Sequence, residues 1–442
     1  MTTPPEEASL LEAATGLVTH ILERLDLPIA VRLWDGRRVA APGASSDVDE
    51  IRVAGPGTLR SLLRRPTLDT LFRLYVTGAI EPVDHDLLAL MNRLQGAAKQ
   101  HRGRLRHVLA GFPWNAARKL AFAPTATNRV THAYAGDAEA RDSRSRDDKR
   151  LVQFHYDASN DFYRLFLDAE MVYSCAYFET FETDLDTAQT AKLDLICKKL
   201  RLRPGERFLD IGCGWGALVC HAARHYGVIA HGVTLSQAQL DLARAKVQSL
   251  GLGDRATLAL EDYRNLDGQW DKIASIGMYE HVGIDNYPAY FRKLGKLLAP
   301  GGILLNHGIT RRAKKEQKAF RRPSASRRII LRYIFPGAEL DHIGHTLEVM
   351  ETAGLEVHDV EGLRRHYART CRLWHERLMA RREAAIDHVG AERFRMWGAY
   401  LAGVAIGFDR GPLRLFQVVA TRQAADGTSP LPPTRADLYV DP

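Results

Sequence analysis

The pattern of apolar and polar positions changes near residue 150 of this 442-residue chain. After Leu151, short apolar runs typical of buried strands alternate with segments of helical periodicity. This alternation is typical of an α/β fold with a doubly wound sheet, which binds ligands at the carboxyl ends of its strands. We expect strands at residues 207–211, 228–233, 256–260, 271–276 and 302–307, and later near 356–360 and 414–421. We expect helices at residues 217–226, 236–250, 287–298 and 341–354.

The first part of the chain has a different pattern. An amphipathic helix is expected near residues 10–25, and a strand pair across residues 29–41 with its turn at Asp35-Gly36. We therefore expect a smaller mixed α+β domain over residues 1–125. Residues 126–150 mix charges with Gly and Ser and indicate a linker before the larger domain, 151–422. Residues 423–442 are rich in Pro, Thr and Asp and indicate a flexible tail.

A glycine turn is the clearest local motif, in "RFLDIGCGWGALVCHAARHYG" at residues 207–227. Gly212, Gly214 and Gly216 alternate between a buried strand and a helix, where bare backbone allows a ligand to lie at a helix N-terminus. A dinucleotide fingerprint would read G-x-G-x-x-G and place an acid after the second strand. The second strand here ends in Thr234-Leu235-Ser236, so nicotinamide binding is disfavoured.

The same turn suits S-adenosylmethionine. Asp210 lies inside the turn, and the zwitterionic tail and sulfonium of that cofactor need local dipoles instead of a phosphate cradle. An ordinary strand-helix corner that binds nothing would have the same appearance, so the turn alone leaves both interpretations open.

The composition places few limits on the fold. A hydrophobic content of 45% is ordinary for a soluble globular protein. The longest nearly apolar run, residues 397–408, is too short to span a bilayer, and the polar, acidic N-terminus is no secretion signal, so we expect a cytoplasmic protein. Five scattered cysteines lack metal-site spacing; we expect reduced thiols and no structural metal.

The net charge of +8 is concentrated in one segment. Residues 311–332 contain ten Lys or Arg against the single acid Glu316, so the rest of the chain is nearly neutral. Apolar residues such as Phe320 and Ile329 lie among these charges, a mixture that suits an anionic lipid surface. RNA binding or a merely solvated loop would also be compatible with the charge.

Seven stretches follow one another in a characteristic order. They are "HYDASNDFYRLFLDAEMVYSCAYF" (155–178), "LDIGCGWGAL" (209–218), "GVTLSQAQ" (232–239), "EDYRNL" (261–266), "IGMYEHVGIDNYPAYF" (276–291), "YIFPGAEL" (333–340) and "HYARTCRLWHERL" (366–378). Together they resemble one family, the cyclopropane-fatty-acyl-phospholipid synthases with the related mycolic acid cyclopropane synthases. The resemblance covers most of residues 150–422, and "FRLYVTGAIEPVDHDLLALM" (72–91) resembles the phospholipid-synthase branch.

The resemblance implies a class I, Rossmann-like methyltransferase domain that binds S-adenosylmethionine. Several of the implied contacts follow predicted strands, at the edge where such a sheet collects its ligand. Together with Asp210 and Gly216 of the turn, the implied contacts are Tyr173, Ser174, Gly212, Gly214, Thr234, Leu235, Gln239, Tyr263, Arg264 and Ile276.

The resemblance also implies a reaction, methylene transfer to the cis double bond of an unsaturated phospholipid acyl chain, which forms a cyclopropane ring. An alkene is a weak nucleophile, so the reaction needs alignment and a dry apolar channel. A base must then remove a proton from the new methyl group. The family's base is a bound bicarbonate, which here would be held by Cys175, Glu280, His307, the backbone amide of Ile309, and Tyr367.

Three other functions stay open. A methyltransferase of the same family would give methylene- or methyl-branched acyl chains. A small-molecule N-methyltransferase shares some motifs but has no use for the first domain. A basic lipid- or nucleic-acid-binding protein with a silent cofactor fold would not need Cys175, Glu280, His307 and Tyr367 together.

The resemblance further implies where the protein works. We expect peripheral association with the anionic inner face of the membrane, no nucleic-acid partner, and lipid binding and homodimerisation through the first domain. One departure is local, since the family often reads H-T-I-G where this chain has His307-Gly308-Ile309-Thr310.

Overall fold

The computed structural model describes residues 5–45, 48–84, 86–100, 108–124, 159–316 and 320–439, which form two compact units. Unit 1 takes its described residues from 1–133, 324–329 and 379–403, and unit 2 from the remainder. The predicted linker, 126–150, lies outside the described residues. The division expected from the sequence did not assign 324–329 and 379–403 to the first unit.

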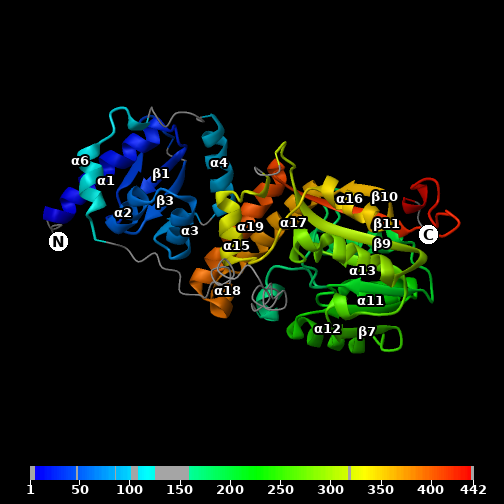
Figure 1. Cartoon of the computed structure of the whole chain (residues 1–442). Coiled ribbons are helices and arrows are strands. Elements are labelled where there is room, and N and C mark those ends of the chain that lie inside the picture. The colour runs from blue at the N-terminus through cyan, green and yellow to red at the C-terminus, as the bar shows by residue number, and fades with distance from the viewer. Residues whose placement is uncertain are drawn as a thin grey trace. The chain divides into compact units, whose positions relative to one another are not determined.

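Unit 1 is built on a four-stranded mixed sheet of order β2-β1-β3-β4 (Figure 1). β1 pairs antiparallel with β2, as expected, and parallel with β3, which pairs antiparallel with β4. Leu11, Leu17 and Leu22 of α1 pack with Val31 and Leu120 in its core. The strands are Ile29–Arg32 (β1), Arg38–Ala40 (β2), Asp49–Val53 (β3) and Ile80–Pro82 (β4), and the helices are Pro5–Arg24 (α1), Pro56–Arg64 (α2), Leu68–Val76 (α3), Leu87–Gln100 (α4) and Trp114–Ala121 (α6).

The distant segment 379–403 joins unit 1 through a buried ion pair. It holds α18 (Arg382–Val389) and most of α19 (Ala391–Arg410). Arg395 donates to the Glu81 carboxylate (2.7 Å), which also accepts from Arg52 (2.5 Å). Burial alone would raise the pKa of Glu81, but the two guanidinium groups outweigh it and hold that pKa below its usual value.

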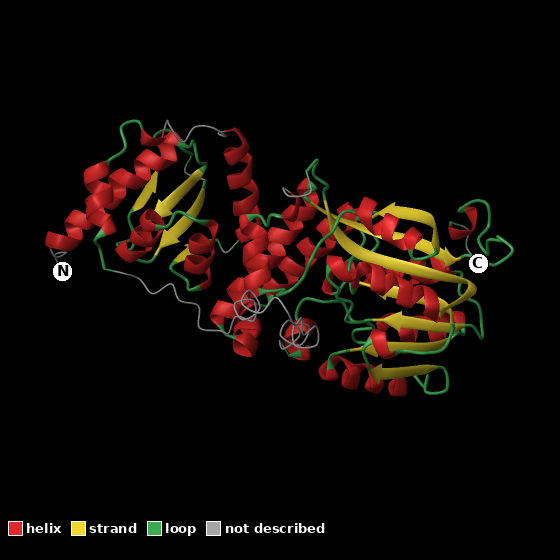
Figure 2. Ribbon diagram, viewed as in Figure 1, coloured by secondary structure: helices red, strands yellow, loops and turns green. Residues whose placement is uncertain are grey.

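Unit 2 contains the predicted α/β architecture, a seven-stranded sheet of order β10-β11-β9-β8-β5-β6-β7 (Figure 2). β9, β8, β5, β6 and β7 run parallel, while β11 is antiparallel to both β9 and β10. All seven expected strands are present, and β9 is much longer than predicted. Their bounds are Arg207–Ile211 (β5), Ile229–Thr234 (β6), Ala256–Leu260 (β7), Trp270–Ile276 (β8), Leu298–Arg311 (β9), Leu355–Gly362 (β10) and Leu413–Arg422 (β11).

Helices cover both faces of this sheet, which confirms the doubly wound fold class. α10, α11 and α12 pack on one face with Phe208, Leu305 and Val419, whereas α13 and α16 pack on the other with Leu304 and Val418. No described helix combines the length and the apolar character needed to cross a bilayer. The helices are Asn160–Arg164 (α9), Leu185–Leu200 (α10), Ala217–Tyr226 (α11), Gln237–Ser249 (α12), Tyr287–Leu297 (α13), Ile343–Thr352 (α16) and Arg364–Ala380 (α17), while Ala325–Tyr333 (α15) is divided between the two units.

The described part of the predicted tail, residues 423–439, packs against unit 2. Leu438 is buried, Asp437 pairs with Arg201 (3.0 Å), and Arg435 pairs with Asp359 (2.8 Å). These contacts fix the chain beyond β11 at Ala436–Leu438, a short 3-10 helix.

The Glu81 ion pair yields a stability prediction. Glu81→Ala leaves the Arg395 charge without its carboxylate, so the free energy of unfolding should fall by about 3 kcal/mol at neutral pH. Because the folded pKa of Glu81 is lowered, this contribution is present above its ordinary pKa and is lost as the pH falls through the folded value. Asp69→Ala, which breaks the half-exposed pair with Arg73, is the control and should cost less than about 1 kcal/mol in urea unfolding. Equal losses in the two variants would contradict this role of Glu81.

Candidate active site

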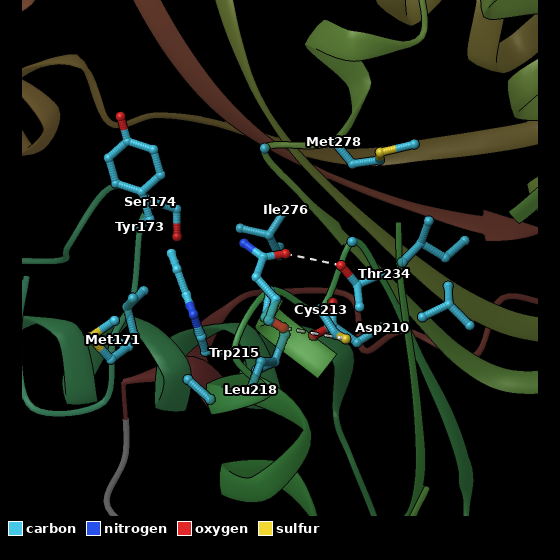
Figure 3. A pocket seen from close by; sticks show the side chains of 18 of the residues that line it. Met171, Tyr173, Ser174, Asp210, Cys213, Trp215, Leu218, Thr234, Ile276 and Met278 are labelled. Atoms are coloured by element: carbon cyan, nitrogen blue, oxygen red, sulfur yellow. Dashed lines mark hydrogen bonds between the residues drawn. The ribbon is translucent and has the colours of Figure 1, made fainter. Parts of the chain in front are cut away.

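A cavity opens at the carboxyl ends of β5, β6 and β8 and beside the residues after β7 (Figure 3). Ten of the twelve predicted cofactor residues line it: Tyr173, Ser174, Asp210, Gly212, Gly214, Thr234, Leu235, Gln239, Tyr263 and Ile276. Figure 3 shows Tyr173 and Ser174 on one side of the cavity and Thr234 on the other, where its hydroxyl bonds to Gln239 (2.9 Å).

The glycine turn forms the floor of this cavity for steric reasons. Gly212 and Gly214 have φ values of +78° and +54°, in the region that favours glycine. Apart from Gly214 itself and its two chain neighbours, no atom of the described residues lies within 4 Å of the position that a Cβ on Gly214 would occupy, so bare backbone faces open space. Gly216 serves packing instead, because its Cβ would lie 3.0 Å from Cβ of Ala243.

Arg264 is the other predicted contact that does not line the cavity. Its guanidinium pairs with Asp262 (2.6 Å) two residues earlier. Glu261, at the tip of β7, lines the cavity instead, and its N–H donates to the Thr234 carbonyl (3.1 Å). The quoted stretch "EDYRNL" is therefore at the cavity, with a carboxylate that the sequence analysis did not single out.

Buried polar side chains of α10 hold the loop that carries Tyr173 and Ser174. Gln189 donates to the carbonyls of Val172 (3.2 Å) and Ser174 (3.0 Å). Lys192, which is 2% exposed, donates to the Ser174 hydroxyl (3.0 Å) and lines the cavity. Neither Gln189 nor Lys192 was predicted, because no helix was expected over α10.

Lys192 and Asp210 give the cavity its electrostatic character. Burial raises the pKa of Asp210 to about 7, although the Lys192 charge opposes this. Burial likewise lowers the pKa of Lys192 to about 8, opposed by Asp168 and other acidic groups. Within the described residues Asp210 Oδ1 has no hydrogen-bond partner, so a buried carboxylate oxygen is left for a cationic or donating ligand.

Among the predicted catalytic residues, Glu280 and Ile309 are joined by a hydrogen bond. The Ile309 N–H donates to Glu280 Oε1 (2.6 Å), while Glu280 Oε2 is buried without a partner among the described residues. Burial raises the pKa of Glu280 to about 7, partly offset by the Ile309 bond. The Ile309 N–H, which was predicted to donate to a bound anion, donates to the Glu280 carboxylate in this structure. An anion would therefore have to share this donor or displace the carboxylate.

The unusual Gly308 is explained by its neighbour Tyr279. A Cβ on Gly308 would lie 2.4 Å from Cδ1 of the Tyr279 ring, which therefore needs a residue without a side chain there. Tyr279 in turn stacks on Tyr287 with ring centroids 4.7 Å apart and precedes Glu280 in the chain. The departure from the family pattern thus accommodates a ring and leaves His307 and Ile309 in place.

The Cys175 thiol and the backbone N–H of Tyr367 both contact the carbonyl of Leu363. The Cys175 thiol lies 3.9 Å from the Leu363 oxygen, and the Tyr367 N–H donates to the same oxygen (3.1 Å). Burial raises the pKa of Cys175, so it stays a thiol, while the Tyr367 ring packs 4.5 Å from that of Phe408.

His307 lies on β9, two residues before Ile309, and is 1% exposed. Gln417 contacts its Nδ1 (3.2 Å), whereas Nε2 has no partner among the described residues. Burial, with the Lys192 and Lys199 charges, lowers the pKa of His307 to about 3, which keeps the ring neutral. No hydrogen bond between described residues joins His307 to Glu280.

The pairing of β8, β9 and β11 connects the Glu280–Ile309 contact with the Leu363 carbonyl that Cys175 and Tyr367 share. Ile309 on β9 pairs with Leu415 on β11, and the Leu415 carbonyl accepts from the Leu363 N–H (3.0 Å). Glu280 follows β8, which pairs parallel with β9, and stands between Met278 and His281 of the cofactor cavity. The predicted base site therefore adjoins the predicted cofactor site.

Comparison with known proteins decides the family. The model of the mycolic acid cyclopropane synthetase family matches residues 143–418. The chain belongs to this family. The resemblance found in the sequence is thereby confirmed, and the chain is an S-adenosylmethionine-dependent methyltransferase of a family that makes cyclopropane or methyl-branched acyl chains.

Family relatives cover different shares of the chain. A probable fatty acid methyltransferase of Pseudomonas putida is 37% identical over 95% of this chain and 98% of its own length. The cyclopropane-fatty-acyl-phospholipid synthase of Escherichia coli K12 is 38% identical over 62% of this chain and 68% of its own. The crystal structure of the mycolic acid cyclopropane synthase CmaA1 with SAH and CTAB is 36% identical, with a TM-score of 0.59 over 63% of this chain and 99% of that chain.

Burial of Glu280 predicts a pH-dependent loss of stability. With a folded pKa of about 7, ionisation disfavours the native state, so raising the pH from 5 to 9 should cost about 3 kcal/mol at this residue. Glu280→Gln keeps the acceptor for Ile309 and removes this cost. Urea unfolding at both pH values should show the stability of the variant gaining on that of the wild type as the pH rises, whereas exposed Glu179→Gln should follow the wild type. Parallel pH profiles for Glu280→Gln and the wild type would contradict the buried carboxylate.

Proposed function

We propose that the protein transfers a methylene group from S-adenosylmethionine to the cis double bond of an unsaturated phospholipid acyl chain and forms a cyclopropane ring. One observation carries the proposal: two buried polar atoms without partners among the described residues, Glu280 Oε2 and His307 Nε2, lie on elements adjoining the cofactor cavity. Buried polar atoms are generally paired with protein, ordered water or a ligand, so a polar ligand beside the cavity could satisfy these two.

The residues present fit both groups that the family implies. Asp210 Oδ1 and the open space at Gly214 suit the cationic cofactor, which supplies an electrophilic methyl group when bound. His307, Cys175 and Tyr367 can donate hydrogen bonds and Glu280 can exchange a proton, a set that suits bicarbonate, whose chemistry would be that of a base.

The chain's own residues supply alignment and dryness. Gln189 and Lys192 fix the loop of Tyr173 and Ser174 over the cavity. Cys175, Glu280 and His307 are all at most 5% exposed, so water is kept from the reacting carbons. Exclusion of water matters because a positively charged carbon on the acyl chain would otherwise be captured by it.

A branched product is the second candidate, and one observation favours it. A relative that matches 95% of the chain is named a probable fatty acid methyltransferase. The two outcomes differ in which proton leaves the cationic acyl chain: loss from the new methyl gives a ring, and loss from a chain carbon gives a branched alkene. The complete set of five predicted base-site residues favours the ring.

The product can be read from lipids. In a bacterial host that lacks the activity, expression of the chain should give cyclopropane proton signals in NMR spectra of the extracted phospholipids. Glu280→Gln should lower turnover by about 10²- to 10⁴-fold while the affinity for S-adenosylmethionine, measured by calorimetry, stays within about twofold. Exposed Glu179→Gln is the control. Signals of an exomethylene or methyl-substituted double bond, distinct from those of the cis double bonds in the host's own lipids, would establish the branched product, and unchanged unsaturated chains would contradict both candidates.

We also propose that the exposed cations of the basic segment attach the protein to anionic lipid. Arg312, Lys315 and Arg322 are exposed there, whereas Phe320, expected to face lipid, is buried against the Arg311 guanidinium (3.6 Å from the ring centroid). The expected attraction is therefore electrostatic.

Vesicle binding tests this attachment. Replacing Arg312, Lys315 and Arg322 by Ser should remove about 1 kcal/mol of binding per charge and make binding less sensitive to salt. The control replaces Arg224, Arg292 and Lys296, exposed cations of α11 and α13, by Ser. Co-sedimentation with vesicles of anionic and of neutral phospholipid would report both, and equal losses in the two triple variants would contradict a specific role for the segment.

A further inference from the structure

A line of polar side chains leads from the surface to His307. Glu361, at the end of β10, contacts the ammonium of Lys199 on α10. Lys199 donates to Gln417 Oε1 (2.7 Å), and Gln417 Nε2 lies 3.2 Å from His307 Nδ1. The Glu361 side chain is 25% exposed, but Lys199, Gln417 and His307 are at most 2% exposed. Burying such a set is unfavourable unless its members are paired, so each contact in it constrains its neighbours.

Lys199 fixes which way the Gln417 amide faces. An ammonium group carries hydrogens to donate and no lone pair, so the group that it contacts must be an acceptor. The amide oxygen of Gln417 therefore faces Lys199, and the amide NH₂ faces the histidine. The orientation follows from the chemistry of the lysine, even though oxygen and nitrogen have nearly the same size.

The amide orientation in turn fixes the hydrogen on His307. An NH₂ group 3.2 Å from Nδ1 can only donate to it, so Nδ1 must present its lone pair. The lowered pKa of His307, caused by burial and by the Lys192 and Lys199 charges, keeps the ring neutral with one hydrogen. That hydrogen is on Nε2, the atom without a partner among the described residues.

Sheet register holds this arrangement rigidly. The antiparallel strands β9 and β11 are neighbours in the sheet (Figure 1). His307 and Gln417 are directly paired on them, so their side chains project from the same face. Ile303, Leu305 and Val419, which point to that face, pack in the same core cluster as α10 residues. Lys199 therefore lies on a helix, α10, whose position is fixed by apolar contacts with the sheet.

We propose that Gln417, oriented by Lys199, is a positioning residue that holds His307 with hydrogen on Nε2, ready to donate to an anion in the base site. The inference rests on the proposed function for its purpose, because a donor at Nε2 is what a bound bicarbonate would require. The tautomer itself is a property of the chain and can be measured without substrate. A structural role alone would predict no link between tautomer and turnover.

The first measurement is the tautomer. The full-length protein labelled with ¹⁵N-histidine should give a His307 signal, assigned by its loss in His307→Gln, with a protonated Nε2 and an unprotonated Nδ1. Gln417→Glu places an acceptor against both Lys199 and the ring, so hydrogen should move to Nδ1. A wild-type protein with hydrogen on Nδ1, or a Gln417→Glu protein with hydrogen still on Nε2, would overturn the inference.

The second measurement is turnover. Gln417→Glu and Lys199→Met should each lower acyl-chain methylation by about 10- to 100-fold, the usual effect of losing a partner that orients a ligand-binding group. Affinity for S-adenosylmethionine should stay within about twofold. Thr421→Val is the control: buried Thr421 lies on β11, as Gln417 does, and its hydroxyl bonds to His358 of β10 (2.8 Å), so the variant loses a polar contact on that strand and should leave turnover unchanged. Normal turnover in Gln417→Glu with a shifted tautomer would overturn the positioning role.

The two proposals can fail separately. If the wild type makes no modified lipid but has the Nε2 tautomer that shifts in Gln417→Glu, the proposed function fails and the hydrogen-bond line stands. If the wild type makes cyclopropane lipid with hydrogen on Nδ1, the line fails and the function stands. The wild-type measurement decides the tautomer even where Gln417→Glu does not fold.

Discussion

The pairing of β9 with β8 on one side and β11 on the other is the constraint on which the site depends. β9 carries His307 and Ile309, β8 leads into the loop of Glu280, and β11 carries Gln417 and receives Leu363. Because side chains alternate along a strand, a slip of β11 by one residue against β9 would turn Gln417 to the face opposite His307. The apolar residues on both faces, Leu304 on one and Leu305 on the other, fix the register and with it the chemistry.

A second constraint is the burial of charge on α10. This helix presents Gln189, Lys192 and Lys199 to the interior, where lysine is unfavourable unless paired. All three side chains make specific contacts there, because Gln189 and Lys192 hold the loop at the cofactor cavity and Lys199 holds Gln417. One helix therefore serves both halves of the site, and its apolar residues supply the anchoring that offsets the burial of its polar ones.

Much of unit 2 could be predicted because its signals are local. Apolar runs bounded by turns located all seven strands, and two of the three alternating glycines, Gly212 and Gly214, line the cavity at the sheet's carboxyl edge. α10 escaped because lysines at apolar-face positions look like solvent-exposed residues, although Gln189, Lys192, Ile196 and Lys199 follow a 3-4-3 spacing that places them on one face. Gly216 and Arg264 were predicted to contact the cofactor but do not line the cavity. Gly216 packs tightly on Ala243 and Arg264 pairs with Asp262, and neither contact can be recognised in a single sequence. The Glu81–Arg395 contact joins residues 314 positions apart and was equally invisible.

The return of residues 379–403 to unit 1 also affects biosynthesis. The four-stranded sheet leaves the ribosome before α19, and Glu81 cannot meet Arg395 until a further 314 residues have been made. Domains generally fold as units while translation proceeds, whereas the full set of contacts of unit 1 can form only after α19 has emerged. The final packing of unit 1 is thus tied to synthesis of α19. A nascent chain that stopped before this helix would lack Arg395, and Glu81 would be left without that partner.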